Sequence, residues 1–223
     1  MNVVLWLAVL FSTFIGYIQA EKTEFNYRII SPVEHQVIQR DSGNVAWVEM
    51  KVATSLPVSK SVPIEYRLDK NRSWENANGE WKDERFVARL SVQAGGWHTL
   101  EVRDSRTPDH RSQVVQFGVG EVFVVAGQSN SGNYGEIKQS TKTGLVSAFD
   151  FDNKKWQLAI DPQPGAGGRG GSIMPLLGDA LSKKLNLPIG IIAYGQGGTS
   201  VREWLPQGSR FPNPPTVENK VRK

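Results

Sequence analysis

The chain has 223 residues, of which 39% are hydrophobic and 22% are charged, which is typical of a globular protein with one large or two small domains and excludes a disordered or collagen-like chain. The formal net charge of +4 arises from scattered Lys and Arg residues without a basic stripe, so we expect no nucleic-acid partner. The sequence contains no cysteine, which excludes a disulfide framework and thiol chemistry.

The first twenty residues have the pattern of an export signal. Residues 3–18 form an uncharged, mostly apolar run, followed by the small Ala20 and the charged Glu21. At about sixteen residues the run is shorter than the ~20 that span a bilayer. We therefore predict a signal peptide over residues 1–20 and a secreted, periplasmic or lysosomal protein without stable membrane insertion. Because no Lys or Arg precedes the run, an N-terminal membrane anchor remains the alternative.

Residues 21–118 alternate between apolar and polar positions with a period of two, which indicates short β-strands with one buried face. Turn-forming residues such as those at 41–43, 76–79, 94–96 and 107–109 separate these runs. The positions expected to face the core are Ala46, Val48, Met50, Val52, Val62, Ile64, Tyr66, Leu68, Phe86, Ala88, Leu90, Val92, Leu100 and Val102. The pattern predicts an N-terminal all-β, immunoglobulin-like sandwich.

The pattern changes in residues 119–223. Residues 122–126 and 187–194 are continuous apolar runs, typical of strands buried on both faces, and a third strand is expected near residues 146–151. An amphipathic helix lies between them, with Ser172 as its cap, Pro175 in its first turn and Asn186 at its end. Its apolar stripe, expected to face the sheet, comprises Ile173, Leu176, Leu177, Ala180, Leu181 and Leu185. This order predicts part of a flavodoxin-like α/β three-layer domain with a parallel sheet.

A serine follows the first of these strands in a turn rich in small residues. Ligands gather at the carboxyl ends of parallel strands, where Ser129 would lie. A second glycine-rich turn, residues 195–198, follows the other strand, and Thr199 or Ser200 could cap a short helix after it. If the two strands are neighbours, backbone N–H groups of both turns could stabilise an oxyanion. The alternative is that Ser129 only caps a helix.

Two segments resemble blocks of a known enzyme superfamily. GEVFVVAGQSNSGNYGE (residues 120–136) resembles the first block of the SGNH hydrolases, in particular the sialate O-acetylesterase and plant acetylesterase branch, in which a strand ends in Gly-Gln-Ser-Asn. LPIGIIAYGQGGTSVREW (residues 187–204) resembles that branch's second block. A β-sandwich before the first block also occurs among sialate O-acetylesterases.

This resemblance implies a carbohydrate O-acetylesterase that cleaves acetyl esters on sugars by serine acyl transfer, with no metal or organic cofactor. Ser129 would be the nucleophile and its own N–H the first oxyanion donor, with Gly197 or Gly198 as the second. Gln128 and Asn130 would shape the turn, and Thr199 belongs to the second block. The alternatives are a non-catalytic glycan-binding protein and an inactive fragment.

The chain also departs from the family. Its catalytic histidine, preceded by an aspartate, comes from near the end of the family's chains, whereas His35, His98 and His110 all precede Ser129. A third block is missing, since Asn213 and Asn219 lack its context, and Ser131 replaces the usual methionine. We therefore expect residues 119–223 to be the front part of an SGNH domain, with little activity by itself.

Three further features have ordinary interpretations. Residues 165–170 (GAGGRG) match a dinucleotide-binding pattern formally, but they do not follow a strand directly, so we interpret them as a flexible loop near the mouth of the site. Trp156 and Trp204 are candidates for stacking on a sugar or for packing. Glu203 is interpreted as a helix-start residue.

Overall fold

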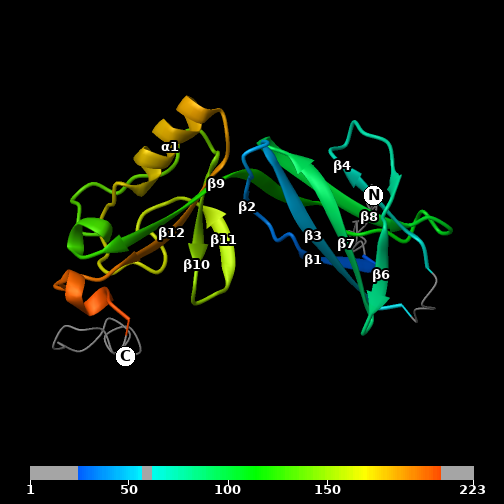
Figure 1. The fold of residues 1–223 in the computed structure, drawn as a ribbon, viewed down its shortest axis with the longest axis horizontal. Coiled ribbons are helices and arrows are strands. Elements are labelled where there is room, and N and C mark those ends of the chain that lie inside the picture. The colour runs from blue at the N-terminus through cyan, green and yellow to red at the C-terminus, as the bar shows by residue number, and fades with distance from the viewer. Residues whose placement is uncertain (1–24, 57–61, 207–223) are drawn as a thin grey trace, which may run out of the picture.

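The structure is a computed structural model that describes residues 25–56 and 62–206. The predicted signal peptide, Asn213 and Asn219 lie outside the described residues. Figure 1 shows a β-sandwich beside a second half that contains the helix α1, with the long strand β9 running between them. The position of β9 makes it the element that connects the sandwich to the predicted site.

The sandwich consists of two sheets. The first is antiparallel, in the order β1 (Tyr27–Ser31), β3 (Val45–Thr54), β7 (Arg85–Gln93) and β6 (Gly79–Lys82). The second contains β9 (Val115–Gly127), β8 (Gly95–Asp104), β4 (Ile64–Leu68) and β5 (Glu75–Asn76), with β2 (Gln36–Gln39) paired to β9. Side chains of both sheets share one core, in which Met50, Leu100 and Phe117 are fully buried. The predicted period-two alternation is confirmed, since the expected residues of β3, β7 and β8 are all buried.

Strand β9 belongs to both halves. Its residues 115–119 pair with β8 in antiparallel orientation, and residues 121–127 pair with β12 (Ile189–Gly195) in parallel orientation. The two halves therefore share one mixed sheet, in the order β11-β10-β12-β9-β8-β4-β5. The proposed domain boundary between residues 118 and 119 falls inside this strand. Gly120 permits the close approach of β12, because a Cβ there would lie 2.0 Å from the carbonyl oxygen of Pro188.

Polar contacts fix the junction between the halves. The Glu121 carboxylate accepts hydrogen bonds from Gln39 Nε2 at 2.7 Å and from Arg40 Nε at 2.8 Å. The Gln39 amide, together with Arg40, holds the pKa of Glu121 below its ordinary value. Trp97 of β8 donates from Nε1 to the carbonyl oxygen of Gly144 at 2.8 Å. These contacts give the sheet a fixed orientation where it enters the second half.

The second half contains a short parallel sheet. β10 (Val146–Asp150) pairs in parallel with β12, and β11 (Lys155–Leu158) forms an antiparallel hairpin with β10. The predicted third strand is confirmed as β10, whereas β11 was not predicted. The helix α1 (Met174–Leu185) leads into β12 and has Pro175 in its first turn. It ends at Asn186, whose φ of 56° is left-handed, as predicted.

The predicted orientation of α1 is wrong. The helix buries Met174, Pro175, Gly178, Asp179 and Ser182. Its predicted inward residues Ile173, Leu176 and Leu177 are 58%, 49% and 43% exposed, and Ala180 and Leu185 are exposed as well. The reason is steric, because Gly178 lies directly against β10, where an added Cβ would be 2.4 Å from Val146 Cγ1. The helix contacts the sheet through the face that carries Met174 and Gly178, with Leu181 partly buried beside it.

The predicted burial of residues 122–126 on both faces is also wrong. Val124 is 67% and Phe123 38% exposed. Within the described part of the chain, residues 121–127 of β9 have a strand on one side only, and α1 is the one helix that covers the parallel sheet. The described residues therefore contain a mostly β fold with one helix, and the three-layer arrangement is not present in them.

Replacing Gly178 with alanine tests the orientation of α1. On an exposed helix face this change stabilises a protein by up to about 1 kcal/mol. Here we expect the free energy of unfolding to fall by about 1–3 kcal/mol, because the new methyl group would overlap Val146. Urea denaturation measures the change, and stabilisation would contradict the described packing.

Candidate active site

Ser129 lies in a tight turn at the carboxyl end of β9. The strand ends at Gly127, and the short 3-10 helix η1 (Ser129–Ser131) follows. The N–H of Ser131 donates to the carbonyl oxygen of Gln128 and that of Gly132 to the carbonyl oxygen of Ser129, both at 2.9 Å. The Ser131 hydroxyl donates back to the carbonyl oxygen of Ala126 at 3.3 Å. These bonds fix the turn while leaving the Ser129 side chain half-buried at its surface.

The two glycine-rich turns lie side by side, which meets the condition that the sequence left open. Gly127 and Gly195, the last residues of β9 and β12, are partners in the parallel ladder. The N–H of Gln196 donates to the carbonyl oxygen of Gly127 at 2.8 Å. Gly195 lies so close to the serine turn that an added Cβ would be 2.1 Å from the carbonyl oxygen of Ser131. The site is therefore built from the ends of adjacent parallel strands.

Several polar groups around this pair of turns have no hydrogen-bond partner among the residues that the structure describes. Among the described residues, no hydrogen-bond acceptor is found for the backbone N–H groups of Ser129, Gly197 and Gly198. The Ser129 hydroxyl likewise forms no hydrogen bond with the described part of the chain. Gln128 precedes η1 as its cap residue, and Asn130 is its second residue. A serine hydroxyl and backbone N–H groups without partners among the described residues thus lie in adjacent turns, which is the arrangement that an oxyanion-stabilising site requires.

The described residues do not bring a histidine to Ser129. His35 lies in the turn before β2, His98 lies in β8, and His110 lies in the turn after β8. His98 contacts Asp69 and the carbonyl oxygen of Gln93, and the ring of His35 packs against Trp97 at 5.7 Å. All three histidines therefore belong to the sandwich half, as the sequence predicted.

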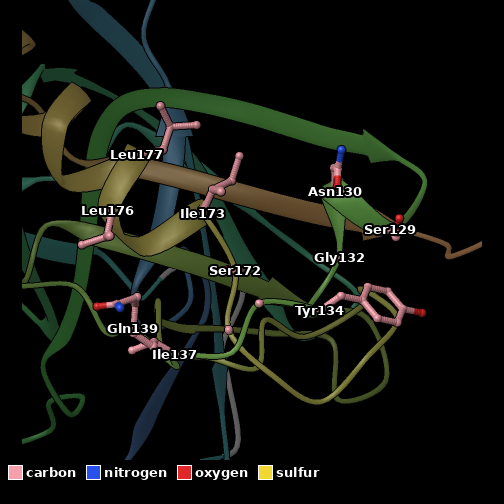
Figure 2. Close-up of a pocket in the computed structure, with 12 residues that line it drawn as sticks. Ser129, Asn130, Gly132, Tyr134, Ile137, Gln139, Ser172, Ile173, Leu176 and Leu177 are labelled. Carbon is pink, nitrogen blue, oxygen red and sulfur yellow. The ribbon is translucent and has the colours of Figure 1, made fainter.

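The turn borders two cavities. The larger, of about 650 Å³, extends from Ser129 and Asn130 along Gly132 and Tyr134 to the first turns of α1. Its far wall is apolar and is formed by Ile137, Ile173, Leu176 and Leu177, as Figure 2 shows. The smaller, of about 380 Å³, is lined by Ala126, Gly127, Gln128, Thr199, Val201 and Trp204. The exposed stripe of α1 is thus one wall of a groove that ends at Ser129.

The buried Asn133 connects the serine turn to the glycine-rich loop. Its side-chain amide donates to the carbonyl oxygens of Gln163 and Ala166, each at 3.0 Å, and its Oδ1 accepts from the Gln163 N–H at 2.7 Å. The loop is further joined to β12, because the Gly167 N–H donates to the carbonyl oxygen of Gly195 at 2.7 Å. Residues 165–170 therefore lie beside the site, as predicted, and are held there by hydrogen bonds.

Asp161 organises the floor of the larger cavity. Its buried carboxylate accepts hydrogen bonds from the Ser172 hydroxyl at 2.6 Å, the Ser172 N–H at 2.8 Å and the Gln139 N–H at 2.9 Å. Ser172 in turn accepts a hydrogen bond from the Met174 N–H at 3.2 Å. The cap residue of α1 is therefore Ile173 and not the predicted Ser172, although Ser172 still contacts the first turn of the helix and is held in place by Asp161.

Asp179 fastens α1 to the loop before β10. Its carboxylate accepts hydrogen bonds from the hydroxyls of Thr141 and Thr143, both at 2.7 Å, and from the Lys142 N–H at 2.7 Å. Burial by itself raises the pKa of Asp179, but these hydrogen bonds outweigh it, so the pKa lies below its ordinary value.

The lowered pKa of Asp179 predicts that the free energy of unfolding falls in acid. Because the folded-state pKa lies below the unfolded value of about 3.9, Asp179 stabilises the fold above that pH and loses its contribution as the pH falls through the folded pKa. We expect Asp179→Asn to be less stable than the wild type at pH 7, with a difference that shrinks below about pH 4. Urea denaturation of both proteins at pH 7 and at about pH 4 measures this difference in the free energy of unfolding. The exposed Asp152→Asn is the control, and a difference independent of pH would contradict the prediction.

Trp156 and Trp204 pack against aromatic neighbours, and Glu203 accepts a hydrogen bond at the start of a short helix. Trp156 packs against Phe149 at 5.4 Å, which favours the packing interpretation. Trp204 packs edge-on against Tyr194 at 5.9 Å and donates to the Thr199 hydroxyl at 3.0 Å, while also lining the smaller cavity. The Glu203 carboxylate accepts a hydrogen bond from the Ser200 N–H at 2.5 Å, so its prediction as a helix-start residue in η2 (Val201–Trp204) is confirmed.

Sequence reasoning missed Tyr134, Asn133 and Asp161. Tyr134 lines the larger cavity, and its hydroxyl lies 2.5 Å from where a Cβ on Gly197 would be. The signal for Asn133 and Asp161 was weak, because a single Asn or Asp in a loop is usually a turn residue. In the residues described, no cluster of three or more His, Cys, Asp or Glu side chains could hold a metal ion. No helix among them is long and apolar enough to span a membrane.

No protein-family model matches the chain, and no curated protein sequence matches it. A carbohydrate acetylesterase from Xanthomonas citri is similar in structure, with a TM-score of 0.46 and 17% identity over 78% of this chain and 41% of that chain. A protein from Arabidopsis thaliana has a TM-score of 0.33 at 18% identity, over 46% of this chain and 48% of its own. The fibronectin(III)-like modules of Clostridium thermocellum CbhA have a TM-score of 0.30 at 16% identity, and the match covers 42% of this chain and 93% of the module chain. This chain thus spans less than half of the acetylesterase.

Proposed function

We propose that this chain carries the nucleophile and the oxyanion donors of a serine esterase of the SGNH class that removes acetyl groups from sugars. The observation that carries the proposal is the position of Ser129: its turn lies beside the 195–198 turn at the ends of adjacent parallel strands, and its hydroxyl has no hydrogen-bond partner among the described residues. The two sequence blocks that resemble the sialate O-acetylesterase branch are the blocks that form these two turns.

The reaction follows from this placement. The Ser129 oxygen attacks the acetyl carbonyl carbon while its proton passes to a general base, and the N–H groups of Ser129 and of Gly197 or Gly198 stabilise the tetrahedral oxyanion. The bond to the sugar oxygen then breaks, and that oxygen takes up the proton as the sugar alcohol leaves. Water next attacks the acetyl-enzyme, releasing acetate and restoring the Ser129 hydroxyl. No step requires a metal ion or an organic cofactor.

The general base must come from outside the described residues, since none of these provides a base hydrogen-bonded to Ser129. The two incompletely covered surfaces beside the site indicate where it would enter. One is the edge of β9 over residues 121–127, which has a strand on one side only among the residues described. The other is the groove walled by Ile173, Leu176 and Leu177, which leads to Ser129. We propose that a histidine from outside the described residues reaches Ser129 there.

Acetate release from acetylated xylan and from 9-O-acetylated sialic acid tests the proposal, using the protein purified from its natural source. The proposal predicts release from at least one of these two substrates. The second candidate, a non-catalytic glycan-binding protein, is favoured by the absence of a base beside Ser129 in the described residues. It predicts binding of these substrates without acetate release, and that result would overturn the esterase proposal.

A further inference from the structure

A further cavity lies in the β-sandwich, at the edge of its first sheet. β6 pairs only with residues 85–88 of β7, so residues 89–93 of β7 have a neighbouring strand on one side only within the described part of the chain. The turn after β4 and the side of β8 enclose about 330 Å³ beside this edge, which is within the usual size range of ligand pockets. The cavity is lined by Leu68, Asp69, Arg72, Ser91, Val92, Gln93 and His98.

Two of these side chains are held rigidly. Asp69 accepts a hydrogen bond from the Thr99 N–H at 2.9 Å through Oδ1, and its Oδ2 lies 3.2 Å from His98 Nδ1. The other ring nitrogen of His98 lies 2.9 Å from the carbonyl oxygen of Gln93. The Asp69 side chain nevertheless remains 37% exposed. It is therefore a fixed acceptor that a ligand hydroxyl can reach.

Arg72 supplies the complementary donor. It lies on the exposed turn after β4, and its guanidinium forms no hydrogen bond or ion pair with the described residues. Arg67 and Arg103, by contrast, are both paired with glutamates on the same sheet. A guanidinium presents a fork of N–H donors that suits oxygen-rich ligands. The cavity thus offers fixed acceptors and an available donor together.

An exposed tryptophan adjoins this cavity. Trp47 of β3 is 66% exposed, although tryptophan side chains are usually largely buried. In the ladder between β3 and β7 it lies directly opposite Ser91, so both side chains point away from the core on the same face. Ser91 also lines the cavity, so Trp47 lies one strand away from the cavity, on the outer face of the same sheet. An exposed aromatic ring beside a polar pocket offers a flat apolar surface and oriented hydrogen bonds to one ligand.

We propose that Trp47 and the cavity formed by Asp69, Arg72, Gln93 and His98 are a carbohydrate-binding site, separate from Ser129. An oligosaccharide matches this arrangement, since the C–H face of one sugar ring can stack on the indole while hydroxyl groups of a neighbouring ring reach Asp69 and Arg72. The site would hold the glycan chain while the second half of the protein acts on its substituents. It does not depend on the esterase proposal, because no residue is shared with the serine turn.

Isothermal titration of the full protein with xylohexaose, a neutral probe, and with hexagalacturonate, an acidic probe, tests the proposal. We expect at least one probe to bind, and Trp47→Ala and Arg72→Ala each to weaken that binding by at least about tenfold. Arg85→Ala is the matched control, because Arg85 is exposed on the sheet that contains Trp47 but does not line the cavity. We expect the affinity of this variant for the probe to remain within about twofold of wild type.

The outcomes separate this site from the catalytic proposal. Trp47 and Arg72 are exposed, so both variants should retain the thermal unfolding temperature of the wild type. Failure of both probes to bind, or binding that neither substitution weakens, would overturn the carbohydrate site. Binding that depends on both residues in a protein that releases no acetate would support this site while contradicting the esterase proposal.

Discussion

Replacing Ser129 with alanine is expected to lower kcat for acetyl-ester hydrolysis by at least about 10³-fold, since loss of the nucleophile in a serine protease lowers kcat by roughly 10⁶. KM should change little, because the turn is fixed by backbone hydrogen bonds that do not involve the Ser129 hydroxyl. Steady-state kinetics on an acetylated substrate measures both constants in the protein from its natural source.

Ser131→Ala is the matched control for this prediction. Ser131 belongs to the same short helix, but its hydroxyl donates to the carbonyl oxygen of Ala126 and so has a structural role. We expect kcat to fall by less than about tenfold, consistent with loss of one partly exposed hydrogen bond. Equal losses for the two variants would show that the turn, and not the Ser129 nucleophile, determines activity.

Replacing Asn133 with alanine is expected to lower the free energy of unfolding by about 2–4 kcal/mol. The substitution removes three hydrogen bonds and leaves backbone groups of the buried Gln163 and the partly buried Ala166 without these partners. Because the same loop is bonded to Gly195, we expect kcat to fall as well. Urea denaturation and steady-state kinetics measure the two effects.

Asn78→Ala provides the control for Asn133. Asn78 is exposed between β5 and β6, and its side chain makes no hydrogen bond with the described residues. The substitution should therefore change the free energy of unfolding by no more than about 0.5 kcal/mol. A stability loss for Asn133→Ala no larger than that of the control would contradict the view that Asn133 fixes the serine turn to the glycine-rich loop.

The features that the sequence predicted correctly depend on short-range patterns. Alternation in the segment around Met50 is enough to orient a strand against a core, and Pro175 and Asn186 delimit a helix by their backbone preferences alone. The adjacency of the Gly127 and Gly195 turns was left open by the sequence, but it agrees with the order strand, helix, strand, which favours parallel neighbours.

The features that the sequence did not predict depend on contacts between distant segments. The apolar stripe at Leu176 and Leu177 was expected to face the sheet, but the close approach of Gly178 to Val146 determines which side of α1 faces it. The exposure of Val124 depends on which strands flank β9, and a single strand's apolar run does not contain that information. The partners of Asn133 lie about thirty residues away, so no local motif indicates them.

Covalent labelling distinguishes an activated nucleophile at Ser129 from an ordinary serine. The protein from its natural source is treated with a fluorophosphonate, and the modified peptide is identified by mass spectrometry. We expect a single adduct on the oxygen of Ser129 in the folded protein, and no adduct when the protein is unfolded before treatment. The absence of an adduct in the folded protein, or an adduct on another serine such as Ser131 or Ser172, would contradict it.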